Sequence, residues 1–277
     1  AITALGPVPF AGAGSYAAAS GQVFTMRGAT LTTNGATLET LTIDTGAVSI
    51  PNAISLNGSL NVSAGGATFG GTAVIGDAAA DALNLTGAAT TFNGNTTVNA
   101  TTSVSSGADL LIRANATFNQ NVTVDGSGSV FDASGNFQLS YGNGTTMLVQ
   151  NMSTLNLSGN AVGQEVRLRS TSAGNRYNTT VTIPEANVTL QNLDVQDSDG
   201  TASTGNILTA ATSVDSGNNL NWFFGNADVT GFLGSGAGDV ILFIDGIQIA
   251  TQTLAGDQSY TFSGVTLDGG ERVAVIK

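Results

Sequence analysis

Apolar and polar residues alternate over short stretches of the chain, and the bends between these stretches are rich in Gly, Ala, Ser and Thr. Alternation over three to six residues, with β-branched residues and frequent Gly or Asn, is typical of short strands joined by tight turns. No window keeps the 3.6-residue period of an amphipathic helix. The pattern therefore predicts an all-β fold.

The alternating stretches also repeat along the chain. An apolar residue that opens a strand is followed nine residues later by another apolar residue in five places: Leu41 and Ile50, Leu60 and Phe69, Leu83 and Phe92, Val122 and Phe131, and Leu148 and Leu157. The best-matched copies are Ala67-Thr68-Phe69, Thr90-Thr91-Phe92 and Ala116-Thr117-Phe118, which begin 23 and 26 residues apart. Such a recurrence is typical of one coil of a solenoid. We expect residues 22–224 to form a parallel β-helix (β-solenoid), with apolar columns inside and Thr or Asn columns outside.

A different pattern follows Phe224. Five strands are predicted there, at Asp228–Phe232, Asp239–Gly246, Ile247–Gln252, Ser259–Val265 and Arg272–Ile276. Ile244-Asp245-Gly246-Ile247 marks a tight hairpin between two of them. The chain therefore divides into an extended, Ala- and Gly-rich segment (1–21), the solenoid (22–224) and a small β-sandwich (225–277).

Two regions resemble a known kind of protein. The run VRLRSTSAG, then VTLQNLDVQDSDG, then VDSGNNLNWFF resembles the closing coils of right-handed parallel β-helix modules in large bacterial cell-surface and autotransporter-like proteins, and VIGDAAADALNLTGAATTFNGNTTV is similar to their repeats. The run FIDGIQIATQTLAGDQSYTFSGVTLDGGERVAVIK resembles the Ig-like β-sandwich modules of such proteins. The resemblance implies an extracellular scaffold or adhesive surface.

The C-terminal region is short for an Ig-like module. A complete sandwich of that type has seven strands and about 100 residues, whereas five strands are predicted in 225–277. The fold class expected is thus all-β, a parallel β-helix followed by a small Ig-like β-sandwich with an unpaired edge.

The amino-acid composition excludes several kinds of catalytic group, metal site and binding partner. Only 9% of residues are charged, against about 25% in ordinary domains. The chain has no His, no Cys and a net charge of −12. Thiol and imidazole catalysis and ordinary zinc sites are therefore excluded. Nucleic acid is a poor partner for so acidic a chain, and no apolar run reaches the length of a membrane span. We expect no membrane insertion, and no cofactor other than calcium.

Three acidic residues, Asp194, Asp197 and Asp199, lie close together in the sequence. A polysaccharide lyase or hydrolase would place such carboxylates on one face, yet the basic and aromatic residues that grip a sugar are missing from this segment. Asp197 and Asp199 are a candidate calcium site, because Asp-x-Asp-Gly supplies oxygen ligands. The alternative is a turn in which these side chains bond their own backbone.

Two alternative roles can also be given for the charged and for the aromatic residues near the end of the solenoid. Arg167 and Arg169, with Glu165, form either a ligand-binding site or a short row of paired charges on the outer surface. Trp222, Phe223 and Phe224 form either a sugar-stacking platform or an apolar cap, since an open solenoid end must be covered.

These features favour a structural extracellular protein without catalytic activity, the repeating subunit of a bacterial cell-surface filament or stalk. An adhesin module binding a surface glycan is the alternative, and a polysaccharide lyase or hydrolase comes third. The apolar N-terminal segment, with Ile2, Leu5, Val8 and Phe10, is the predicted assembly strand, which would insert into residues 226–277 of a neighbour and give a head-to-tail homo-polymer. The rival interpretation is that this segment caps the first coil of its own solenoid.

Overall fold

The computed structural model describes residues 2–4, 8–9, 21–33, 37–204, 207–210, 212–224, 226–232, 236–244, 246–256, 258–266 and 273–277. Across these residues the regular structure is β-strand, apart from one short 3₁₀ turn at Glu185–Asn187. The predicted all-β class is confirmed.

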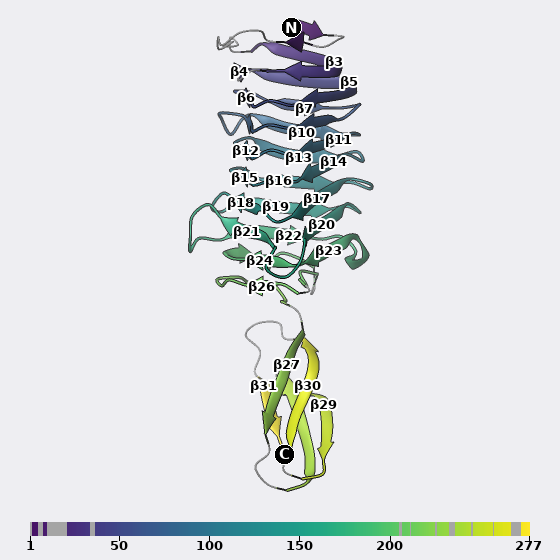
Figure 1. The fold of residues 1–277 in the computed structure, drawn as a ribbon, viewed down its shortest axis with the longest axis vertical. Helices are drawn as coiled ribbons and strands as arrows, with labels where there is room; N and C mark the ends of the chain where they lie inside the picture. Colours follow the sequence, from purple (N-terminus) through teal and green to yellow (C-terminus); the bar gives the residue numbers. More distant parts are fainter. Residues whose placement is uncertain are drawn as a thin grey trace.

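The strands of residues 23–215 stack as a parallel β-solenoid with three faces, PB1, PB2 and PB3 (Figure 1). PB1 contains β3 (Val23–Thr32), β5 (Thr40–Ile50), β7 (Leu60–Val62), β10 (Ala82–Thr86), β13 (Thr101–Ser105), β16 (Val122–Asp125), β19 (Thr146–Gln150), β22 (Tyr177–Val181) and β25 (Ser198–Asp199). PB2 contains the second halves of β3 and β5, then β8 (Ala67–Phe69), β11 (Ala89–Phe92), β14 (Asp109–Ile112), β17 (Val130–Gly135), β20 (Thr154–Gly159) and β23 (Val188–Gln191).

PB3 contains one strand from each coil: β4 (Thr37–Leu38), β6 (Ile54–Leu56), β9 (Ala73–Ile75), β12 (Thr96–Val98), β15 (Ala116–Phe118), β18 (Gln138–Tyr141), β21 (Val166–Ser170), β24 (Leu193–Val195) and β26 (Val214–Asp215). These form one nine-stranded parallel sheet. The described part of the chain therefore makes nine coils, and the expected parallel β-helix is confirmed.

Alternation in the sequence becomes alternation between core and surface. In PB1, Leu41 pairs with Leu60 and Leu60 with Leu83, and all three are fully buried. The residue after each of them, Thr42, Asn61 or Asn84, lies on the outer side of the same strand. Because equivalent positions pair coil after coil, apolar residues at every second position form continuous buried columns.

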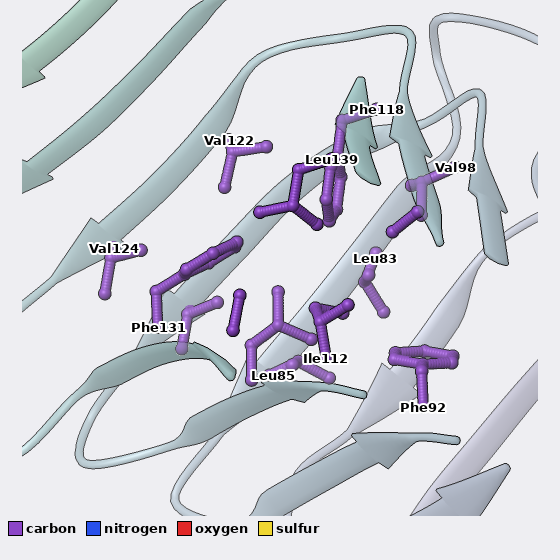
Figure 2. Close-up of a cluster of buried hydrophobic side chains, with 14 of the residues drawn as sticks. Leu83, Leu85, Phe92, Val98, Ile112, Phe118, Val122, Val124, Phe131 and Leu139 are labelled. Carbon is purple, nitrogen blue, oxygen red and sulfur yellow. The ribbon is translucent and has the colours of Figure 1, made fainter. Parts of the chain in front are cut away.

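The three faces enclose one apolar core. Figure 2 shows Leu83, Leu85, Phe92 and Val98 of one coil together with residues of the two coils that follow, all within the space between the faces. Aromatic side chains stack from coil to coil: Phe69 and Phe92 have ring centroids 4.6 Å apart, and Tyr141 and Tyr177 have theirs 4.7 Å apart. Such pairs contribute about 0.5–1.5 kcal/mol beyond their buried area.

The structure corrects two details of the predicted repeat. Ala67–Phe69 and Thr90–Phe92 do pair, but Ala116–Phe118 lies on PB3 and pairs with Thr96–Val98 instead. Leu148 points outward, opposite Thr123, while Met147 and Val149 are buried. Coils differ in the length of their bends, so a fixed spacing of nine residues does not follow one column throughout.

Stacked bends require glycine at specific points. A Cβ added to Gly94 would lie 2.2 Å from the backbone oxygen of Gly71, in the bend of the preceding coil. This approach is too close for any side chain, so the tight stacking of the bend selects glycine there.

At the N-terminal end, two short strands add to the first coil. β1 (Ile2–Ala4) pairs in parallel with the first half of β3, and β2 (Val8–Pro9) pairs in parallel with its second half. Since β5 occupies the other side of β3, β1 and β2 lie at the end of the stack.

The five predicted C-terminal strands are present, and Figure 1 shows them beyond β26. β27 (Asn226–Phe232) pairs with β30 (Ser259–Thr266), and β28 (Gly238–Ile244) lies between β29 (Ile247–Leu254) and β31 (Val273–Ile276), all antiparallel. A separate core contains residues from both sheets: Val240, Leu242, Ile244, Leu254, Phe262 and Val265. We call these five strands the C-terminal module.

Candidate functional site

The acidic residue Asp194 is held by its neighbours. Arg169 forms an ion pair with its carboxylate and also donates to its backbone oxygen at 2.6 Å. Ser216 donates to Asp194 Oδ1 at 2.5 Å. Asp194 and Arg169 lie on the neighbouring PB3 strands β24 and β21, so their contact ties two coils together.

Asp197 is almost fully buried, with 2% of its surface exposed, and has a positive φ of 59°. Its Oδ2 accepts a hydrogen bond from Gly174 N at 3.1 Å, and its Oδ1 accepts one from Asn218 Nδ2 at 2.6 Å. Both carboxylate oxygens therefore join bends of successive coils.

Asp199 bonds a different neighbour. Its Oδ1 accepts hydrogen bonds from Thr201 N at 3.0 Å and from Thr201 Oγ1 at 2.6 Å. This local geometry is the one that the turn alternative predicts. Within the described ranges, no three acidic side chains come together in a way that could hold a metal ion. The calcium site at Asp197 and Asp199 stays a prediction.

Arg167 and Arg169 have different surroundings. Arg167 is exposed on PB3, opposite Gln138 on one side and Asp194 on the other. Arg169 is bonded to Asp194, whereas the Glu165 carboxylate accepts a hydrogen bond from Gly163 N in its own bend. The arrangement links Arg169 to the next coil and leaves Glu165 in a separate contact.

Trp222 lies at the C-terminal end of the solenoid core. It is 4% exposed and belongs to the same apolar cluster as the coils. Its indole Nε1 donates to Ser198 Oγ at 2.9 Å, and that hydroxyl is also 2.9 Å from Thr179 Oγ1. A buried indole offers no open face on which a sugar could stack.

Phe223 and Phe224 continue this end of the core. Phe223 is buried, and its backbone bonds Leu208 and Ala210 at 3.0 and 2.7 Å. The Phe224 ring lies 6.1 Å from that of Trp222 and packs against the core cluster. Trp222 and Phe224 thus extend the solenoid core beyond its last strand, and the cap formed by the three residues stays a prediction.

Three asparagines that the sequence analysis did not single out fasten the last bend. Asn218 Nδ2 donates to Asp197, Asn219 Nδ2 to Val195 O at 2.8 Å, and Asn221 Nδ2 to Gly200 O at 3.1 Å. Asn218 and Asn221 have positive φ values of 59° and 55°. Asn tolerates this backbone conformation better than most residues. The density of Asn next to the only Trp was therefore the sequence signal that could have indicated a hydrogen-bonded bend here.

Burial changes the ionisation of several side chains. It raises the pKa of Tyr141 and of Tyr177, both fully enclosed in the core. Burial also raises the pKa of Asp109, with a further contribution from the negative charge of Asp132. In contrast, the hydrogen bond and charge of Arg27 lower the pKa of Asp44.

A shallow groove of about 390 Å³ runs along the bends between PB1 and PB2 in three successive coils. It is lined by small residues: Ala47, Val48, Gly65, Gly66, Ala67, Thr68, Gly87, Ala88, Ala89 and Thr91. The hydroxyls of Thr68 and Thr91 are its polar side-chain groups. Its lining offers backbone and hydroxyl groups and contains no charged side chain.

The predicted assembly residues lie at the other end of the stack. Ile2 in β1 is paired with Phe24, and Val8 in β2 with Leu31, both within the same chain. This is the arrangement that the self-capping interpretation expects. Leu5 and Phe10 lie outside the described residues. Assembly through this segment stays a prediction.

No helix in the described part of the chain has the length and apolar character needed to cross a membrane. Comparisons with protein-family models, with curated proteins and with solved structures found no match to the chain.

Proposed function

We propose that the chain is a structural extracellular protein, the repeating subunit of a cell-surface filament or stalk that assembles head-to-tail through β-strand contacts. The observation that carries this proposal is that side chains link each coil to the next along the solenoid axis. Some of these side chains lie in the core and others lie on the outer surface. Such linkage suits a stiff spacer.

Inside the core, the linkage consists of stacked rings. Phe118 stacks on Tyr141 with centroids 5.7 Å apart, and Tyr141 stacks on Tyr177. On the outer surface it consists of amide pairs: Asn84 Nδ2 donates to Asn61 Oδ1 at 2.9 Å, and Asn119 Nδ2 to Asn99 Oδ1 at 2.8 Å. Each pair joins two successive coils.

Ion pairs also run along the axis. Arg27 bonds Asp44 at 2.8 Å, Arg113 bonds Asp132 at 3.0 Å, and Arg169 bonds Asp194, in each case across neighbouring coils. An exposed ion pair contributes only about 0–1 kcal/mol. Their common direction nevertheless adds to the cohesion of a rod that must resist tension along its length.

The C-terminal module fits this proposal as a short Ig-like β-sandwich of the type found in large bacterial surface proteins. Two antiparallel sheets with a shared apolar core support this assignment. Its described residues form five strands, fewer than a seven-stranded sandwich has, which leaves sheet edges among them for contacts between subunits.

The second candidate function is an adhesin module that binds a neutral glycan, and the groove along the PB1–PB2 bends favours it. Ala89 is exposed and lines this groove. If glycan binding is the function, Ala89→Tyr should abolish binding on a glycan array, and Ala79→Tyr, on an exposed bend outside the groove lining, should not.

A polysaccharide lyase or hydrolase is the third alternative. It needs carboxylates that are available to a substrate, whereas Asp194 and Asp197 are bonded within the solenoid on both carboxylate oxygens. We therefore propose a non-catalytic role.

Immunogold electron microscopy of intact source cells tests the proposed function. Antibodies against the purified protein should label filaments or stalks outside the cell at regular intervals. Label confined to the cell interior, or scattered over a smooth surface without extended structures, would contradict it.

A further inference from the structure

Strand β28 is apolar on both of its faces. Five successive residues, Val240 to Ile244, are large and apolar. Val240, Leu242 and Ile244 are buried in the core of the C-terminal module, while Ile241 and Phe243 point to the opposite side and are only half-buried. A continuous apolar run is typical of a strand that is covered on both faces. Among the described residues, the outer face of β28 is only partly covered.

The neighbouring strand β31 extends this outer face. Ile276 lies opposite Ile241, and Ala274 lies opposite Phe243, so that these four side chains share one side of the sheet. Ile276 is 50% exposed and Ala274 is exposed as well. We call Ile241, Phe243, Ala274 and Ile276 the outer apolar face. Contiguous exposed apolar residues of this kind mark interaction surfaces.

The same strand has a free edge. β31 pairs with β28 on one side, and among the described residues it has no strand partner on the other. An edge of unpaired N–H and C=O groups beside an apolar face is the geometry that accepts an added strand.

The charge distribution indicates which surface can approach this face. The chain carries a net charge of −12, so most surfaces of a second copy repel one another. The stretch Ala1–Met26, which includes β1 and β2, contains no charged residue. Within the described pairings, β1 bonds only β3, and its other edge has no strand partner among the residues that the structure describes.

We propose that the outer apolar face and free edge of β31 dock the free edge of β1 from a second copy of this chain. This inference rests on the proposed structural function and names its contact surface. Because the two surfaces differ, the contact is heterologous and repeats along an open filament. At the C-terminal end, Trp222 and Phe224 pack against the solenoid core, so this end presents side chains rather than an open β-coil.

Disulfide cross-linking of the 277-residue chain tests the contact, and the absence of Cys from this chain makes each introduced thiol unique. Thr3→Cys in β1 and Ala274→Cys in β31 are made in separate preparations, one of which carries a mass tag, and are mixed under mild oxidation. Val162→Cys replaces Ala274→Cys in the control mixture, because Val162 is 75% exposed on a solenoid bend.

The Thr3→Cys and Ala274→Cys mixture should give at least about tenfold more tagged heterodimer than the control, since docking raises the effective concentration of the two thiols. Equal yields in the two mixtures would overturn the contact. Cross-linking of Ala274→Cys with itself in preference to Thr3→Cys would also overturn it, by showing a symmetric β31–β31 contact.

A second variant separates this inference from the proposed function. Ile241→Thr combined with Ile276→Thr keeps β-branched residues in both strands and should abolish polymers seen by electron microscopy, with an unchanged circular dichroism spectrum. Val162→Thr, at another exposed apolar position, should leave polymers intact. Persistent polymers of the double variant overturn this contact alone, whereas a wild-type protein that never polymerises contradicts the proposed function as well.

Discussion

The indole Nε1 of Trp222 donates a hydrogen bond to Ser198 Oγ at 2.9 Å. The two residues are 24 positions apart, and the bond joins the segment that leaves the solenoid to the beginning of its last coil. Ser198 is itself fully buried and bonded to Thr179 in the coil before. The buried indole of Trp222 thus has a hydrogen-bond partner for its N–H, as a buried Trp requires.

Replacement of Trp222 should open this end of the core. Trp222→Ala should lower the free energy of unfolding by about 3–5 kcal/mol, because a large buried side chain is lost and a cavity remains. Trp222→Phe keeps most of the apolar volume and should cost roughly 1 kcal/mol, mainly for the lost hydrogen bond. Urea titration followed by circular dichroism measures both values, and equal small effects would show that Trp222 does not cap the core.

The general architecture could be predicted because it depends on local alternation. Leu41, Leu60 and Leu83 each precede a small polar residue and each fall in one buried column, as a period of two requires. The repeat could not predict the face on which Ala116–Phe118 lies. This segment has the same three residue types as Ala67–Phe69, but the bends around the two segments differ. Tertiary register decides between such matched strands.

The polar contacts at the end of the solenoid were harder to predict. Asp197 and Asp199 look alike in sequence, yet one is buried between bends and the other bonds Thr201 beside it. The difference arises because Asn218 and Gly174, far away in sequence, meet at Asp197 when coils stack. The density of Asn marks the bend, but the coil that each side chain contacts has no local signal.

The aromatic column should contribute strongly to stability. Phe92→Ala should destabilise the protein by about 3–5 kcal/mol, whereas Phe92→Leu, which fills most of the space, should cost less than about 1.5 kcal/mol. Phe232→Ala serves as the control, because Phe232 is 68% exposed, and its effect should stay within about 0.5 kcal/mol. If Phe232→Ala lowered the free energy of unfolding as much as Phe92→Ala does, the stabilising role of the stacked Phe92 ring would be refuted.

Asp197 should matter more for stability than Asp199. In Asp197→Asn, an amide NH₂ group replaces one of the two oxygens that accept hydrogen bonds from Gly174 N–H and from the Asn218 amide. One of these donors then loses its acceptor, which should lower the free energy of unfolding by about 1–3 kcal/mol. Asp199→Asn keeps an oxygen for Thr201 and should change stability by less than about 0.5 kcal/mol.

Thermal melts of both variants and of the wild type, with calcium chloride or with a chelator, distinguish this account from a calcium site. The turn account predicts the same melting temperatures in both conditions. A wild-type melting temperature that rises with calcium, and loses this rise in both variants, would establish a bound ion instead.

The raised pKa of Asp109 predicts a specific pH dependence. A carboxyl whose pKa is higher in the folded state than its unfolded value of 3.8 binds more protons when folded, so its contribution to stability falls as pH rises through this range. Asp109→Asn should therefore increase the urea midpoint at neutral pH, and the increase should vanish in acid where Asp109 is protonated. Leu111→Asn, a nearby outward position on the same strand, should show no such pH dependence. An Asp109→Asn effect that is the same at both pH values would contradict the assignment.

This chain is proposed to be a subunit that repeats head-to-tail. Negative-stain electron microscopy of the purified wild-type protein, over a series of concentrations, tests it most directly. We predict unbranched polymers of uniform width whose axial repeat contains one chain. Isolated rods or closed oligomers at every concentration would contradict the claim.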